Sequence, residues 1–126
     1  MLLAGVKSRE ALANILEKLT KTVPQIEAVS IVSIEGLPIA SVLPKEVDEM
    51  RIAAVTAAML SMGENASTEL RKGTLSEIMV QGTTGYVITM ASGNSAVLTA
   101  SATKEVEIGY IYHFMKRYAK DIEASL

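Results

Sequence analysis

The stretch that decides the fold spans residues 46–72 and reads EVDEMRIAAVTAAMLSMGENASTELRK. Its apolar residues return at steps of three and four, which is the spacing of an α-helix. Glu46, Asp48 and Glu49 stand at its start, where carboxylates stabilise the positive end of the helix dipole. Gly73 follows where a glycine is common, just beyond the end of a helix. We therefore predict one helix over residues 46–72, which is long for a chain of 126 residues.

This predicted helix is apolar on two sides. One side carries Ile52, Val55, Met59, Met62, Ala66 and Leu70. The opposite side carries Met50, Ala53, Ala57 and Leu60, with Ala54 and Ala58 on the flank between the two. A helix that lies on one sheet needs only one apolar stripe. We expect Met59 and Met62 to fill the core, and the side of Met50 to be covered by a partner chain. Coverage by another helix of the same chain is the alternative.

The rest of the sequence predicts two more helices and five strands. An amphipathic helix begins at Ser8 as its N-cap and ends by residue 22. Strands over residues 28–34 and 37–43 form a hairpin around Glu35-Gly36. Three more strands follow at residues 77–81, 85–91 and 95–102. The last helix covers residues 104–124, with Thr103 as its N-cap.

The order of these elements predicts the fold class. Successive strands are joined by short turns rather than by helical crossovers, so the sheet is mainly antiparallel. We predict an α+β fold of order α-β-β-α-β-β-β-α with a single five-stranded sheet. The long second helix covers one face, and the first and third helices cover the other. No linker, repeat or low-complexity stretch divides the sequence, so we expect one domain over residues 1–126.

Composition narrows the classes of function. Apolar residues make up 49% of the chain and charged residues 21%, with a net charge of −2. These values are typical of a globular protein and unlike those of a general nucleic-acid binder. The absence of cysteine from the sequence excludes disulfides, thiolate metal sites and a cysteine nucleophile. No apolar run reaches the roughly 18 to 20 residues that span a bilayer. We expect a cytoplasmic protein that neither binds nucleic acid nor inserts into a membrane.

The sequence contains few groups that could carry catalysis. It has no G-x-x-x-x-G-K-[ST] phosphate loop and no G-x-S-x-G nucleophile elbow. Its single histidine, His113, has no acidic residue three or four positions before it, which favours a structural role. Glu105 and Glu107 precede the last helix, where stabilisation of the helix dipole accounts for them. We therefore expect no enzyme activity, no cofactor and no metal site.

Several segments together resemble a known family. The first is the hairpin AVSIVSIEGLPIA at residues 28–40. The others are the alanine-rich helix at 52–66 with Ser61-Met62-Gly63-Glu64, the strand segments Gly85-Tyr86-Val87-Ile88 and Leu98-Thr99-Ala100, and Gly109 in the last helix. In order and length these segments are similar to the roadblock family, the dynein light-chain roadblock group that includes the bacterial gliding-motility regulator of a Ras-like GTPase. The resemblance covers residues 8–122 and implies a roadblock, profilin-like fold.

This resemblance implies a homodimer held by two contacts. The third strand pairs with its copy to extend the sheet across both chains, and the second helices pack antiparallel over the seam. On the helix, the corresponding contact residues are Met50, Ala53, Ala54, Ala57, Ala58, Leu60 and Ser61. On the strand they are Ile78, Met79, Val80 and Gln81. The two apolar sides of the predicted helix agree with such a partner.

The resemblance also implies a function in signalling. Family members are noncatalytic platforms that bind Ras-like small GTPases, and some modulate the nucleotide cycle of the GTPase, in cell polarity or motility. The GTPase lies over the paired second helices, where this sequence has Arg51, Ser61, Asn65, Thr68 and Lys72. The alternative function is a small-molecule sensor of PAS-like architecture, because that fold also surrounds a central antiparallel sheet with helices.

Overall fold

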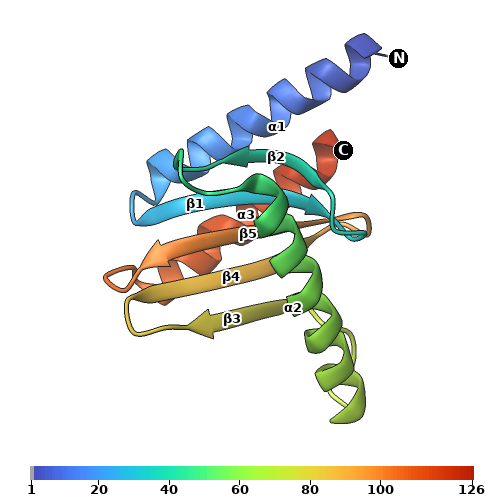
Figure 1. The fold of residues 1–126 in the computed structure, drawn as a ribbon, viewed down its shortest axis with the longest axis vertical. Helices are drawn as coiled ribbons and strands as arrows, with labels where there is room; N and C mark the ends of the chain where they lie inside the picture. The colour runs from blue at the N-terminus through green and yellow to red at the C-terminus, as the bar shows by residue number, and fades with distance from the viewer. Residues whose placement is uncertain (1) are drawn as a thin grey trace.

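The fold is an antiparallel sheet between two layers of helices (Figure 1). The computed structural model describes the backbone of residues 2–126 and the side chains from Arg9 onward. Its elements are α1 (Leu2–Thr22), β1 (Ile26–Ser33), β2 (Pro38–Val42), α2 (Glu49–Glu69), β3 (Glu77–Gln81), β4 (Gly85–Ser92), β5 (Ala96–Thr103) and α3 (Ile108–Ser125). The strands lie in the order β2-β1-β5-β4-β3, and every neighbouring pair is antiparallel. The predicted fold class and element order are confirmed.

The two faces of the sheet are packed differently. On one face, α1 and α3 enclose the main core, whose fully buried members include Leu16, Ile31, Leu98, Ile111 and Met115. On the other face, Ala53 of α2 forms a much smaller apolar cluster with Val32 and Val97 of the sheet. The difference follows from the alternation of side chains along each strand, because the buried Ser30 and Thr99 face α2. Most of the apolar burial therefore lies on the side of α1 and α3.

Three threonine hydroxyls form a buried network beneath α2. The Oγ1 atom of Thr99 lies 3.1 Å from Oγ1 of Thr56 on α2 and 3.0 Å from Oγ1 of Thr89 on β4. All three side chains are buried. A buried hydroxyl costs free energy unless it forms a hydrogen bond. The network therefore fixes which side of α2 faces the sheet.

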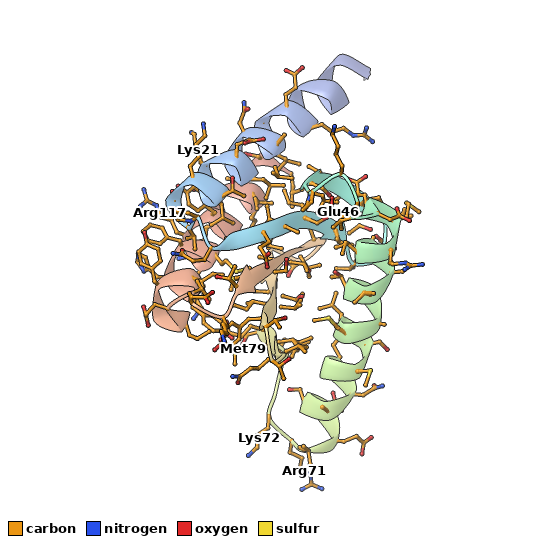
Figure 2. All side chains as sticks on the ribbon, turned by 60° about the vertical axis from the view of Figure 1, so that its left-hand side comes forward. Lys21, Glu46, Arg71, Lys72, Met79 and Arg117 are labelled. Atoms are coloured by element: carbon orange, nitrogen blue, oxygen red, sulfur yellow. The ribbon has the colours of Figure 1, made fainter. Side chains whose placement is uncertain are left out.

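α2 crosses the sheet obliquely, and its C-terminal half extends past β3 (Figures 1 and 2). Gly63 lies against β3 and the segment that precedes it. A Cβ atom built on Gly63 would stand 2.7 Å from Cδ1 of Ile78 and 3.0 Å from Cδ2 of Leu75. Glycine at this position lets the helix approach β3.

The starts of the first two helices differ from the sequence prediction. α1 begins at Leu2, so Ser8 lies inside the helix and is not its N-cap. Residues 2–7 include leucine, alanine and lysine, whose high helix propensity favours this extension. α2 begins after Asp48, because Oδ1 of Asp48 accepts a hydrogen bond from the N–H of Met50 at 3.0 Å, and Glu46 lies outside the helix.

The start of α3 was also predicted wrongly. Its N-cap is Glu107 and not Thr103, and the helix begins at Ile108. The carboxylate of Glu107 accepts hydrogen bonds from the N–H groups of Gly109 and Tyr110, at 3.0 and 2.8 Å. One side chain thus satisfies two of the backbone donors that a helix start leaves unpaired.

The end of α2 lies before the predicted one. The helix ends at Glu69, and the N–H groups of Arg71 and Lys72 donate to the carbonyls of Thr68 and Ser67, at 3.1 and 2.7 Å. This pair of hydrogen bonds is the Schellman motif. Its left-handed residue is Arg71, with φ of 56°, where we expected the glycine two positions later.

Candidate partner-binding site

α2 leaves an apolar surface that no other described part of the chain covers. We define the outer face of α2 as the residues on the side opposite Ala53 and Thr56: Arg51, Ala54, Val55, Ala58, Met62, Asn65 and Ala66. All seven are exposed, and the side chains of Val55 and Met62 are 50% and 73% exposed. Contiguous exposed apolar surface marks interaction sites more often than scattered apolar residues do.

The structure turns α2 differently from the sequence prediction. Three residues that we expected to contact a partner lie toward the chain's own sheet: Ala53, Ala57 and Leu60. Ala53 is fully buried there, so it has no surface to offer another chain. Met62 was expected in the core but is exposed, whereas Met59 is half-buried. The cause is Thr56, which needs its hydrogen bond to Thr99 and therefore occupies the centre of the buried side.

β3 forms the second part of the site, because it is the outermost strand on its side of the sheet. Within residues 2–126 it pairs with β4 alone. Met79 and Val80 are 42% and 47% exposed, Gln81 is exposed, and Ile78 is half-buried beneath Gly63. A free strand edge presents N–H and C=O groups that another strand can pair with. All four residues predicted for strand pairing therefore lie on an accessible edge strand.

The residues that the resemblance places against a GTPase are all exposed: Arg51, Ser61, Asn65, Thr68 and Lys72. Arg51 and Asn65 belong to the outer face of α2. Lys72 lies beyond the helix, at the tip of the projecting turn (Figure 2). The five residues thus form a strip along α2 rather than a compact cluster.

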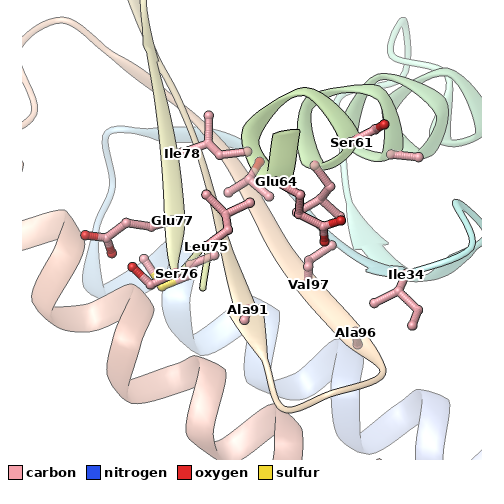
Figure 3. Close-up of a pocket in the computed structure, with 14 residues that line it drawn as sticks. Ile34, Ser61, Glu64, Leu75, Ser76, Glu77, Ile78, Ala91, Ala96 and Val97 are labelled. Carbon is pink, nitrogen blue, oxygen red and sulfur yellow. The ribbon is translucent and has the colours of Figure 1, made fainter. Parts of the chain in front are cut away.

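Two cavities lie along the contact between α2 and the sheet. The larger, which we call the α2 pocket, has a volume of about 220 Å³ and is lined by α2, the β1–β2 turn and residues of β3, β4 and β5 (Figure 3). The smaller, near Ile52 and Ser101, has about 90 Å³. Both fall below the roughly 300 to 1,000 Å³ of typical small-molecule sites, whereas a third pocket, of about 430 Å³ between β4 and α3, lies within this range. Sequence reasoning missed the α2 pocket, because its walls come from separate elements.

Other polar groups have structural roles. His113 packs edge-on against the ring of Phe114, with ring centroids 4.9 Å apart.

In the part of the chain that the structure describes, no three His, Asp or Glu side chains are grouped so that they could hold a metal ion. Over the same residues, no helix is both long and apolar enough to cross a membrane. The site therefore offers apolar surface and free backbone groups, which suit contact with another protein.

Comparisons with known sequences agree with these features. The family model of the Roadblock/LC7 domain matches residues 12–102. Two proteins of Methanocaldococcus jannaschii, MJ1340 and MJ0310, are each 33% identical to this chain over 111 residues. Each alignment covers 88% of this chain and 96% of the relative.

Solved structures have the same fold at low sequence identity. An MglB structure with a tetrameric arrangement has a TM-score of 0.86 at 16% identity, over 94% of this chain and 89% of that one. The gliding protein MglB of Thermus thermophilus has a TM-score of 0.85 at 16% identity, over 94% of this chain and 90% of that one. Profilin IB of Acanthamoeba castellanii has a TM-score of 0.64 at 13% identity, over 89% and 96%. Since the family model spans most of the sequence, the predicted resemblance is confirmed, and the chain belongs to the Roadblock/LC7 family.

Proposed function

We propose that this chain is a noncatalytic scaffold that forms a homodimer and binds a Ras-like small GTPase, whose nucleotide cycle it modulates. The observation that carries the proposal is the exposed outer face of α2 beside the free edge of β3. Membership of the Roadblock/LC7 family supports it, because the resemblance described above implies this role. The scaffold acts through surface and backbone contacts, and we assign no catalytic group to it.

In the proposed homodimer, β3 pairs with β3 of a second copy, and the two α2 helices pack antiparallel over the seam. Strand pairing satisfies the N–H and C=O groups of the free edge. Because α2 extends past β3, its projecting half lies over the second copy rather than over solvent. The proposed interface contains Met50, Ala54, Val55, Ala58, Ser61, Met62, Ile78, Met79, Val80 and Gln81. An MglB protein has a tetrameric arrangement, which supports self-association by this fold.

We propose that the GTPase binds over the paired α2 helices. The residues that contact it are Arg51, Ser61, Asn65, Thr68 and Lys72. They are exposed and polar, which suits a reversible interface of modest area. The nucleotide cycle changes because the contact reshapes the GTPase's own active site, and we propose no arginine finger from this chain.

Sedimentation of two variants tests the dimer. Ala58→Glu places a carboxylate in the proposed helix contact, and Ala11→Glu makes the same change at an exposed position of α1. Ala58 is preferred to Ala57, which is half-buried in its own chain. We expect the wild type and Ala11→Glu to sediment at twice 13.4 kDa, and Ala58→Glu as a monomer with unchanged helix content. A monomeric wild type or a dimeric Ala58→Glu would contradict the proposed interface.

A pull-down tests the GTPase. The immobilised wild-type protein is incubated with Ras-like GTPases of the same cell, loaded with GTP or GDP. We expect one of them to be retained in its GTP-loaded form. A triple variant with alanine at Arg51, Asn65 and Lys72 should lose this retention, and Ala11→Glu should keep it. Retention of no GTPase, or equal retention by the triple variant, rejects the assignment.

A further inference from the structure

The α2 pocket carries an inference that does not depend on the proposed function. Its volume is about 220 Å³. This exceeds the roughly 150 Å³ of an apolar cavity that admits benzene, and falls short of the roughly 300 Å³ at which sites for drug-sized ligands begin. The pocket is therefore sized for one or two amino-acid side chains rather than for a cofactor.

Aliphatic and polar groups share the pocket wall. Its aliphatic lining residues are Ile34, Ala57, Leu60, Leu75, Ile78, Ala91, Ala96 and Val97. The side chain of Ile34 is 53% exposed, and Leu37 in the same β1–β2 turn is 59% exposed. An apolar side chain that enters the pocket removes part of this surface from water, which is favourable. The aliphatic part of the wall therefore offers a contact surface for an apolar side chain.

One carboxylate gives the pocket its charge. Figure 3 shows the side chain of Glu64 directed from α2 toward Val97, on the strand side of the pocket. Glu77 also lines the pocket, but its side chain turns away (Figure 3), and its Oε2 lies 3.9 Å from Nζ of Lys116. Glu64 forms no ion pair or hydrogen bond with another described residue, and no Lys, Arg or His is among the lining residues. The pocket thus combines an aliphatic patch with the carboxylate of an exposed residue, Glu64, that lacks a counter-charge.

We propose that the α2 pocket binds a peptide segment of a partner protein in which an apolar side chain stands next to an arginine or lysine. The apolar side chain contacts the aliphatic lining residues of the pocket, and the cation pairs with Glu64. A neutral or acidic segment would partly dehydrate this carboxylate without pairing it, which costs free energy. The site therefore discriminates by charge.

A methyl NMR titration of the full-length protein with two short peptides tests this site. Acetyl-Leu-Arg-amide carries both recognised groups, and acetyl-Leu-Gln-amide lacks only the charge. We expect the arginine peptide to bind about fivefold tighter, the upper factor for one ion pair near the surface. The methyl signals that shift should belong to pocket residues, namely Leu60, Leu75, Ile78 and Val97.

Two carboxamide variants isolate the charge. Glu64→Gln should remove the preference for the arginine peptide. Glu69→Gln, on the same helix but outside the pocket lining, should keep it. Equal binding of the two peptides to the wild type, or an unchanged preference in Glu64→Gln, would overturn the proposal.

A third variant tests the apolar wall. Ala91→Leu fills the pocket without changing its charge, so it should weaken both peptides while the helix content stays unchanged. The proposal would also be overturned if the methyl shifts spread outside the pocket. It would be overturned as well if no peptide bound because a second copy closes the pocket. Sedimentation at the same protein concentration shows whether a dimer has formed, so failure of the dimer and failure of the peptide site are told apart.

Discussion

Gly63 on α2 lies directly over Ile78 on β3, so closely that a Cβ atom on Gly63 would stand 2.7 Å from Cδ1 of Ile78. The contact joins the helix that bears the exposed apolar surface to the strand whose edge is free. The height of α2 above the sheet is therefore set by the side chains at this crossing, and substitutions here should be coupled.

Replacing Gly63 by alanine brings two opposing effects. Alanine favours the helix by about 1 kcal/mol, but its methyl group must displace Ile78, and overpacking costs about 1 to 3 kcal/mol. We expect Gly63→Ala to lower the free energy of unfolding by about 1 kcal/mol in urea titrations. In an Ile78→Val background, which lacks the clashing Cδ1 atom, the same substitution should cost less stability, although Cδ2 of Leu75 would still stand 3.0 Å from the new Cβ. A double-mutant cycle with no favourable coupling would show that the two residues do not meet.

Thr99 joins the hydroxyls of Thr56 and Thr89 under α2. Thr99→Val leaves both without their shared partner, so we expect the free energy of unfolding to fall by about 1 to 3 kcal/mol. Thr103→Val, at the half-buried end of the same strand, should change it by less than about 0.5 kcal/mol. Equal effects in chemical denaturation would argue against the hydroxyl network.

Arg71 holds the left-handed position of the Schellman motif, with φ of 56°. A side chain in this conformation costs roughly 1 to 2 kcal/mol, which glycine avoids, so Arg71→Gly should raise the free energy of unfolding by about 1 kcal/mol. Lys72→Gly lacks this gain and should be slightly destabilising, because glycine increases the entropy of the unfolded chain. The stabilities of the two variants can be compared by thermal unfolding. A destabilised Arg71→Gly would contradict the assigned conformation.

Truncation of Met115 should cost far more stability than truncation of Met62. Met115 is fully buried, so Met115→Ala should cost about 2 to 5 kcal/mol of stability. Met62 is 73% exposed, and in the Ala58→Glu background, where the proposed partner is absent, Met62→Ala should change stability by less than about 0.5 kcal/mol. Both values come from urea unfolding at one protein concentration. A large loss of stability in Met62→Ala would show that the side chain of Met62 is buried in the core, as the sequence predicted.

The architecture could be predicted from sequence because its signals are local. Strands alternate aliphatic with small polar residues, glycines mark the turns, and the bounds of β3, Glu77–Gln81, agree with those predicted. The stretch from residue 46 to 72 was recognised as a long helix, although its ends at Asp48 and Glu69 depend on hydrogen bonds that periodicity does not reveal.

The rotation of α2 could not be predicted, because it depends on contacts with distant strands. Alanines and methionines surround this helix, so no single stripe of large side chains identifies the buried side. The buried side is instead the one that carries Thr56, whose hydrogen-bond partner Thr99 lies 43 positions later in the sequence. The same rotation moves Ala53 inward and Met62 outward. Residues predicted to contact a second chain therefore needed correction even though the predicted helix exists.

The unequal packing of the two sheet faces has a consequence for how such proteins diversify. Most of the apolar burial that stabilises the fold lies between the sheet and α1 and α3. Substitutions of exposed side chains on α2 therefore have little effect on folding. Copies of the gene can then acquire new binding specificities through substitutions of a few exposed side chains on α2, while the rest of the fold stays unchanged.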